Sequence, residues 1–69
     1  MVQYYFYAHG EEFRIGLKIS TGKYKIFNSE LELVDSGFSL FAITEKNESE
    51  YCNSVIREFI RNLSKIGEK

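Results

Sequence analysis

The sequence predicts an α+β fold, in which a small antiparallel sheet of four to five strands, built from β-hairpins, precedes one C-terminal α-helix packed on one face. Three observations predict it. Aromatic and β-branched residues dominate residues 2–8, and apolar residues alternate with polar ones over residues 11–19, as in half-buried strands. Glycine-containing segments interrupt that alternation, as hairpin loops do. From residue 47 onward, apolar residues recur at the three- and four-residue spacings of a helix.

The first hairpin is predicted from residues 2–8 and 11–19, with His9 and Gly10 as its two-residue loop. This loop sets a register with three apolar pairs on one face: Phe6 with Phe13, Tyr4 with Ile15, and Val2 with Leu17. The other face pairs Tyr7 with Glu12, Tyr5 with Arg14, and Gln3 with Gly16. A slip of one residue would mix the two faces, so the hydrophobic pattern favours this register.

A second hairpin loop is predicted at Thr21 and Gly22. The expected partners are Ile19 with Tyr24, Leu17 with Ile26, Lys18 with Lys25, and Gly16 with Phe27. Alternation resumes over residues 31–34, and the residues at 35–37 have the chemistry of a turn. Residues 38–44 then read as a further strand, apolar on both sides. If Leu33 and Leu40 point inward, Val34, Phe41 and Ile43 point outward.

The C-terminal segment predicts a helix over residues 48–66, with Asn47 as its N-cap and Glu50 completing a capping box. Gly67 is placed to end the helix. The apolar stripe of this helix consists of Tyr51, Cys52, Val55, Ile56, Phe59, Ile60, Leu63 and Ile66.

Length and composition limit the classes of protein to consider. The 69 residues predict one domain over 1–69, and the chain has no evident leader or membrane-spanning stretch. A single cysteine also excludes an internal disulfide. From these observations together we expect a cytoplasmic protein with no membrane partner. Phe, Tyr, Met, Ile, Asn and Lys supply 29 residues, against 10 for Gly, Ala, Arg and Pro. Such a bias suggests an AT-rich genome, such as a low-GC bacterium or its phage, in which case the cytoplasm is that of the bacterial host.

Catalytic and metal chemistry are not expected. The chain has one histidine, His9, in a predicted turn, and one cysteine, Cys52, on the apolar helix stripe. A nucleophile needs a base within reach, and a structural zinc site needs four ligands. The glycines are scattered and form no phosphate loop. We therefore expect no enzyme, no cofactor and no metal site.

The acidic middle of the chain predicts a first candidate surface. Residues 30–50 carry a net charge of −5, between flanking segments of +2 each, for a total of −1. An exposed apolar strip bordered by carboxylates is typical of a contact with a basic protein. Its members are Glu30, Glu32, Val34, Asp35, Phe41, Ile43, Glu45 and Glu48. The same apolar strand could instead pair with itself as an exposed edge, which would give a homodimer.

The polar face of the first three strands predicts a second surface. Basic residues interleaved with aromatic ones suit single-stranded nucleic acid, because rings stack on bases and cations meet phosphates. Its members are Tyr5, Tyr7, Arg14, Lys18, Lys23, Lys25 and Phe27. The expected Lys18–Lys25 pair would be locally unfavourable, and a bound anion would relieve that repulsion.

In size and layout alone, the chain resembles many short antitoxins, immunity proteins and phage-encoded inhibitors. The leading hypothesis is a non-enzymatic inhibitor or adaptor that acts by protein–protein contact. Its partner would have a basic surface, and in a nucleic-acid-handling enzyme the carboxylates would occupy phosphate sites. An anti-defence inhibitor, such as an anti-CRISPR, is a special case of this hypothesis. The alternative is a single-stranded RNA- or DNA-binding protein that uses the basic–aromatic sheet face.

Overall fold

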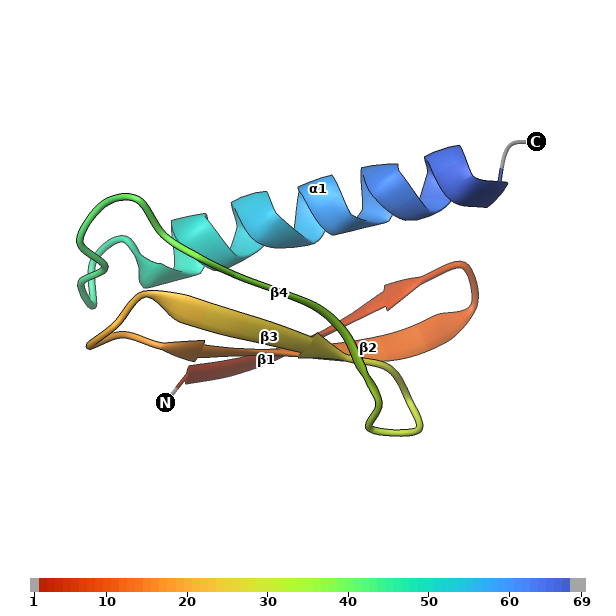
Figure 1. Cartoon of the computed structure of the whole chain (residues 1–69), viewed down its shortest axis with the longest axis horizontal. Helices are drawn as coiled ribbons and strands as arrows, with labels where there is room; N and C mark the ends of the chain where they lie inside the picture. Colours follow the sequence, from red (N-terminus) through yellow and green to blue (C-terminus); the bar gives the residue numbers. More distant parts are fainter. Residues whose placement is uncertain (1, 68–69) are drawn as a thin grey trace.

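The computed structural model describes residues 2–67, and side chains over residues 2–64. Four antiparallel strands form one sheet in the order β1-β2-β3-β4, and one helix follows them (Figure 1). The elements are β1 (Val2–Ala8), β2 (Glu11–Lys18), β3 (Lys23–Phe27), β4 (Leu33–Phe38) and α1 (Glu48–Gly67). The expected α+β fold is thus confirmed, with four strands. No helix within the described residues combines the length and apolar character that crossing a bilayer requires.

The β1–β2 hairpin has the predicted register at every pair, from Val2 opposite Leu17 to Tyr7 opposite Glu12. Its loop residues His9 and Gly10 have φ values of 54° and 76°. Positive φ at both central positions is the geometry of a type I′ turn, whose twist matches that of the flanking strands. The hydrophobic pattern and the turn therefore agree on a single register.

The β2–β3 hairpin differs from the prediction by two residues. Leu17 lies opposite Tyr24 and Lys18 lies opposite Lys23, so the expected pairing of Lys18 with Lys25 is wrong. The loop takes four residues, 19–22, because the backbone N–H of Gly22 donates to the carbonyl of Lys18 at 2.8 Å. A shift of two residues leaves every side chain on its predicted face, since strands alternate with period two.

The β4 strand occupies the segment that was expected to turn at residues 35–37. Gly37 lies opposite Tyr24, and an added Cβ on Gly37 would come within 2.7 Å of the Tyr24 phenol oxygen. This glycine therefore makes room for a ring rather than forming a turn. A bulge also interrupts the β3–β4 pairing, since Phe27 lies opposite Leu33 while Ile26 lies opposite Asp35. Val34 is the extra residue on β4.

The expected strand over residues 38–44 is wrong beyond Phe38, because the chain there forms a loop with its own hydrogen bonds. The backbone N–H of Ser39 donates to the carbonyl of Gly22 at 2.9 Å, and that of Phe41 donates to Ser39 Oγ at 3.1 Å. Asn47 holds the end of this loop: its side chain accepts from the Thr44 N–H at 2.8 Å and donates to the Ala42 carbonyl at 3.2 Å.

The helix begins directly after Asn47, whose carbonyl accepts the N–H of Tyr51 at 3.0 Å. Asn47 is thus the N-cap residue as predicted, but its side chain bonds to the preceding loop instead of making the expected capping box with the first helical turn. The helix was expected to end before Gly67 and instead includes it. The side chain of Ile66, the last member of the predicted stripe, lies outside the described side chains.

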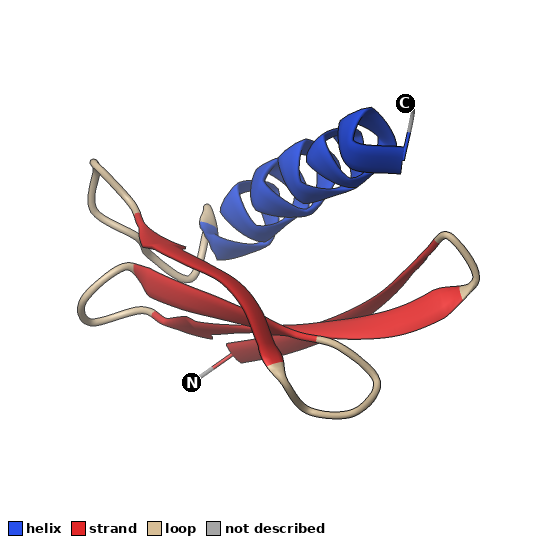
Figure 2. Cartoon of the chain, turned by 45° about the vertical axis from the view of Figure 1, so that its right-hand side comes forward, coloured by secondary structure: helices blue, strands red, loops and turns tan. Residues whose placement is uncertain are grey.

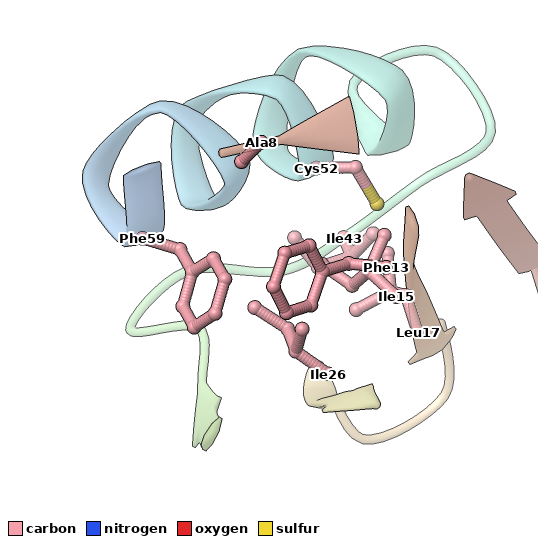
Figure 3. Packing of buried hydrophobic residues seen from close by; sticks show 8 residues of the cluster. All are labelled: Ala8, Phe13, Ile15, Leu17, Ile26, Ile43, Cys52 and Phe59. Carbon is pink, nitrogen blue, oxygen red and sulfur yellow. The ribbon is translucent and has the colours of Figure 1, made fainter. Parts of the chain in front are cut away.

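The helix covers one face of the sheet and leaves the other bare, as Figure 2 shows. Ile15, Leu17 and Ile26 are fully buried beneath it, and the helical side chains of Cys52 and Phe59 point toward them (Figure 3). The Phe59 ring meets the Phe13 ring edge-on, with 5.2 Å between centroids. Burial of these side chains is the main force that holds the two layers together. We call the face beneath the helix the inner face and the opposite one the outer face.

Candidate functional site

A row of three side chains crosses the outer face. Tyr5 lies opposite Arg14, which in turn lies opposite Phe27, so the row spans β1, β2 and β3. The Arg14 guanidinium carbon is 5.6 Å from the centroid of the Phe27 ring, the geometry of a cation–π contact. Tyr5 and Tyr7 are 62% and 72% exposed. Flat rings and a planar cation are thus presented together to solvent.

Lysines flank this row on the same face. Lys18 and Lys23 lie opposite one another, and Lys25 lies opposite Gly16. All three lysines are exposed, and Glu12 is the one carboxylate that shares the outer face of β1–β3 with them and Arg14. Because like charges repel when directly opposed, the Lys18–Lys23 pair is locally unfavourable. The outer face is therefore cationic although the chain as a whole carries a net charge of −1.

The lysines surround a hollow of about 480 Å³ over Gly16, which has no side chain to fill it. Its lining is Gly16, Lys18, Thr21, Lys23, Lys25 and Phe27. The Phe27 ring and the lysine methylenes give the hollow an apolar wall, while the amines provide positive charge around it. Its chemistry therefore suits a planar or apolar group that is attached to anionic groups.

All seven residues predicted for the basic–aromatic surface lie on this one face. The sequence analysis missed Leu33, which lies opposite Phe27 and is 55% exposed, and Ser36, which lies opposite Lys25. The alternation over residues 31–34 was a signal for a strand here. The bulge at Val34 gave no such signal, and without it Leu33 cannot be assigned to the outer face.

The acidic candidates are divided between two places. Glu30 and Glu32 lie in the β3–β4 loop, with their backbone N–H groups donating to Asn28 Oδ1 at 2.9 Å each. Beyond the other end of β4, Glu45 lies in the turn before α1 and Glu48 is the first residue of α1. The six residues of β4, which extend over about 17 Å at ~3.3 Å per residue, lie between the two groups along the chain. They do not form the continuous strip that was expected.

Of the apolar members of the acidic strip, Val34 and Phe41 are exposed as expected, whereas Ile43 is not. Ile43 was expected to point outward, but it is 8% exposed and belongs to the core, because the 39–47 loop folds back toward α1. The outward facing was predicted on the condition that Leu33 and Leu40 point inward, but these two side chains are 55% and 91% exposed. Phe41 does point outward, at 58% exposed, with its ring edge-on to Tyr51 at 5.7 Å.

Two further acidic candidates have specific neighbours. Asp35 lies opposite the buried Ile26, so it is on the inner face rather than at an outer rim. Glu48 accepts hydrogen bonds from the Tyr4 hydroxyl, at 3.0 Å to each carboxylate oxygen. Burial, followed by this hydrogen bond, raises the pKa of Tyr4. Glu48 is therefore part of the contact between β1 and the helix.

Cys52 and His9 lie apart. Ser64 Oγ is 3.4 Å from His9 Nε2, whereas Cys52 lies about 18 Å away along the helix, at 1.5 Å per residue. Burial raises the pKa of the Cys52 thiol to about 11, with a smaller contribution from Glu48, which leaves the thiol protonated at neutral pH. Among the residues that the structure describes, no group of three or more His, Cys, Asp or Glu side chains could hold a metal ion.

Comparison with known proteins gives no relative: no family model, no curated protein and no solved structure matches this chain. The assignment of a function therefore rests on the geometry of the chain itself.

Proposed function

We propose that this protein binds single-stranded RNA or DNA on the outer face of its sheet. One observation carries the proposal: the hollow over Gly16 has the Phe27 ring on its wall and Lys18, Lys23 and Lys25 around it. Single-strand binders combine such cations with rings on which bases stack. Tyr5 and Tyr7 extend the stacking surface across β1, and both are largely exposed.

In this proposal each group has a role. A base stacks on Tyr5 or enters the hollow against Phe27, while the lysine amines contact the phosphates on either side of it. Arg14 lies over the Phe27 ring, with 5.6 Å between its guanidinium carbon and the ring centroid, and offers both a planar group and charge. A bound phosphate also relieves the repulsion between Lys18 and Lys23.

Fluorescence anisotropy with labelled oligo-dT and oligo-U of about 15 nucleotides tests the proposal, because that length covers a site of this size. We expect Tyr5→Ala to weaken binding about 5- to 150-fold, since stacking contributes ~1–3 kcal/mol per base. Phe41→Ala is the matched control, because Phe41 is similarly exposed but lies outside the sheet. Absence of binding at low salt, or an equal loss in the control, would rule the proposal out.

The hypothesis of an inhibitor or adaptor that binds a basic protein, including the anti-defence case, stays a prediction and is our second candidate. One observation favours it. Leu31 is 65% exposed between Glu30 and Glu32 and has a φ of 63°. This left-handed conformation costs a leucine about 1–2 kcal/mol and is unusual for so large an apolar side chain. An exposed apolar group between carboxylates is suited to a basic partner with an apolar pocket.

A capture experiment tests this second candidate with wild-type and Glu32→Lys proteins as paired baits, and mass spectrometry identifies the retained proteins. We expect a basic partner to be retained by the wild type and lost by the variant. Glu50→Lys is the control, because it makes the same charge change on an exposed helical residue. Equal retention by wild type and Glu32→Lys would count against the loop as a binding site.

A further inference from the structure

The inner side of β4 is not covered by the helix. Among the described residues, α1 lies over β1 and β2, and no Cα atom of α1 comes within 8 Å of one in β3 or β4. Two adjoining hollows of about 390 and 230 Å³ occupy the space between β4 and α1, and both are lined by Asp35, Phe59 and Asn62. We call this space the β4 groove. It lies on the opposite side of the sheet from the lysines.

The lining of the β4 groove is apolar and acidic. Phe13, Phe59 and Leu63 line the larger hollow together with Val34. The charged side chains are Glu11 and Asp35 in the larger hollow and Asp35 and Glu58 in the smaller one. No lysine or arginine is among the described residues of either lining. Burial, together with the negative charges of Asp35 and, less, Glu58, raises the pKa of Tyr24, which lines the smaller hollow.

Asp35 has no cationic partner among the described side chains. Its carboxylate accepts a hydrogen bond from the N–H of the adjacent Ser36 at 2.8 Å. The ion pair found in the described part of the chain does not involve Asp35, because it joins Glu58 to Arg61 at 3.8 Å. The carboxylate nevertheless lies on the inner face, opposite the fully buried Ile26. A partly buried charge of this kind is stabilised by a cation brought from outside. The groove is thus complementary to a positive charge.

The edge of β4 is also free, because β4 is the last strand of the sheet and bonds to β3 alone. An exposed edge can accept an added strand, whose alternate side chains then point into a neighbouring groove. A second copy of this chain is a poor candidate. Antiparallel pairing of β4 with itself would bring two Asp35 carboxylates close together near the symmetry axis, where like charges repel.

We propose that the β4 groove binds an extended segment of a partner protein by strand addition to β4, and that this segment carries Lys or Arg next to an aliphatic residue on the same face. The cation pairs with Asp35, and the aliphatic side chain fills the larger hollow against Phe59 and Leu63. The six residues of β4 accommodate about six residues of the partner. The site is separate from the proposed nucleic-acid face and does not depend on it.

Amide NMR titration with a blocked synthetic peptide of sequence TVTKTVT tests this proposal. Valine and lysine share one face of that peptide when it is extended. We expect saturable shifts confined to residues 33–38 of β4 and 54–63 of α1, and slower amide hydrogen exchange along β4. The same peptide with glutamate in place of lysine should cause no such shifts. Absence of shifts along β4 at millimolar TVTKTVT would overturn the proposal.

Asp35→Asn is the decisive variant, because asparagine keeps an acceptor for the Ser36 N–H and removes only the charge. We expect it to weaken peptide binding at least about tenfold, as loss of a charge-assisted contact does. Glu45→Gln, an exposed carboxylate outside the groove, should leave binding unchanged. Equal weakening in both variants would overturn the proposal.

Two other occupants are distinguished in the same experiment. If the amide chemical shifts of β4 change with protein concentration in the absence of peptide, and light scattering gives the mass of a dimer, a second copy occupies the edge of β4. The proposal then fails. If oligo-dT displaces the peptide and itself shifts β4, the groove is a nucleic-acid site and the proposal also fails. Unchanged peptide binding in the presence of oligo-dT supports it, whether or not the oligonucleotide binds the outer face.

Discussion

The hydroxyl of Tyr4 donates to both carboxylate oxygens of Glu48, each at 3.0 Å, and so joins the first strand to the first residue of the helix across 44 positions of sequence. Glu48 also lies where the helix dipole favours a negative charge. Because both effects act on the same carboxylate, substitution of Glu48 alone cannot separate them. Glu50, an exposed acid in the same helical turn, experiences the dipole without the phenol.

We therefore expect Glu48→Ala to lower the thermal midpoint Tm more than Glu50→Ala does. Tyr4→Phe should also lower Tm, and it should have no further effect in the Glu48→Ala background, because the bond is then already absent. Circular dichroism melts of the four variants measure this coupling. Additive effects of Tyr4→Phe and Glu48→Ala would show that the hydrogen bond contributes nothing to stability.

Replacement of Gly37 tests the close approach between β3 and β4. Gly37→Ala forces the Tyr24 ring to move, since its Cε2 and Cζ atoms would be 2.8 Å from the new Cβ, and Tyr51 packs edge-on against that ring. We expect a loss of about 1–3 kcal/mol in the free energy of unfolding, as overpacking causes. Urea denaturation measures it.

A second substitution identifies the ring as the cause. In a Tyr24→Val background, most of the loss from Gly37→Ala should disappear. Gly10→Ala is the contrasting control: its Cβ meets nothing within 4 Å, but its φ of 76° is strained for alanine. Its cost should be the same in the wild-type and Tyr24→Val backgrounds, so relief of both alanine variants would contradict this explanation.

Stability should fall at alkaline pH. Burial is the main cause that raises the pKa of Cys52 from 9.0 to about 11, and it also raises that of Tyr51 above its usual 10.0. Such groups lose their protons more readily in the unfolded chain, so the unfolded state gains stability as pH rises. The free energy of unfolding should therefore be unaffected by these groups below about pH 9 and decrease between pH 9 and 11. Guanidinium titrations across this range measure it, and an increase would contradict the assigned burial.

The same burial predicts a slow thiol. A pKa raised by two units lowers the thiolate fraction of Cys52 at pH 8 about 100-fold relative to the unfolded chain. We expect iodoacetamide to modify native Cys52 at least that much more slowly than it modifies the protein in concentrated guanidinium. Mass spectrometry of timed samples gives both rates, and equal rates would show that the thiol is accessible.

Lys23→Glu should change stability and oligonucleotide binding in opposite directions. The substitution replaces the repulsive pair with Lys18 by an attractive one, which should raise the free energy of unfolding by about 0.2–1 kcal/mol. It should also weaken oligo-dT binding and make the slope of log affinity against log salt shallower by about 0.7 per lost phosphate contact. Lys46→Glu, which changes an exposed lysine before the helix, should leave binding unaffected. Tighter or unchanged binding by Lys23→Glu would exclude Lys23 from the interface.

The accuracy of prediction from sequence followed the physical strength of each local signal. The β1–β2 register was predictable because three apolar pairs and a two-residue loop agreed. The loop at residues 19–22 was misplaced because Ile19 looked like a strand residue, although it is only partly buried and belongs to the turn. The basic–aromatic surface was still predicted correctly as one face, since the error was an even number of residues.

The rest depended on contacts between distant residues. Gly37 was predicted to lie in a turn, but it lies in a strand and leaves space for the Tyr24 ring beside it. The apolar run at residues 38–44 looked like a strand, but Asn47 and Ser39 hold it as a loop with Ile43 inside and Leu40 outside. The acidic surface was predicted on the assumption that residues 38–44 form a strand. Because they form a loop, its members are divided in space.

The sheet is one residue layer thick, and its opposite sides carry opposite charge: lysines over Gly16 on the outside and Asp35 in the groove on the inside. The lysine cluster and the Asp35 carboxylate therefore face away from one another across the sheet. Electrostatic attraction would draw a polyanion toward the lysines and away from the Asp35 side. A ligand held by the lysines would thus leave the groove on the far side of the sheet open to a second partner.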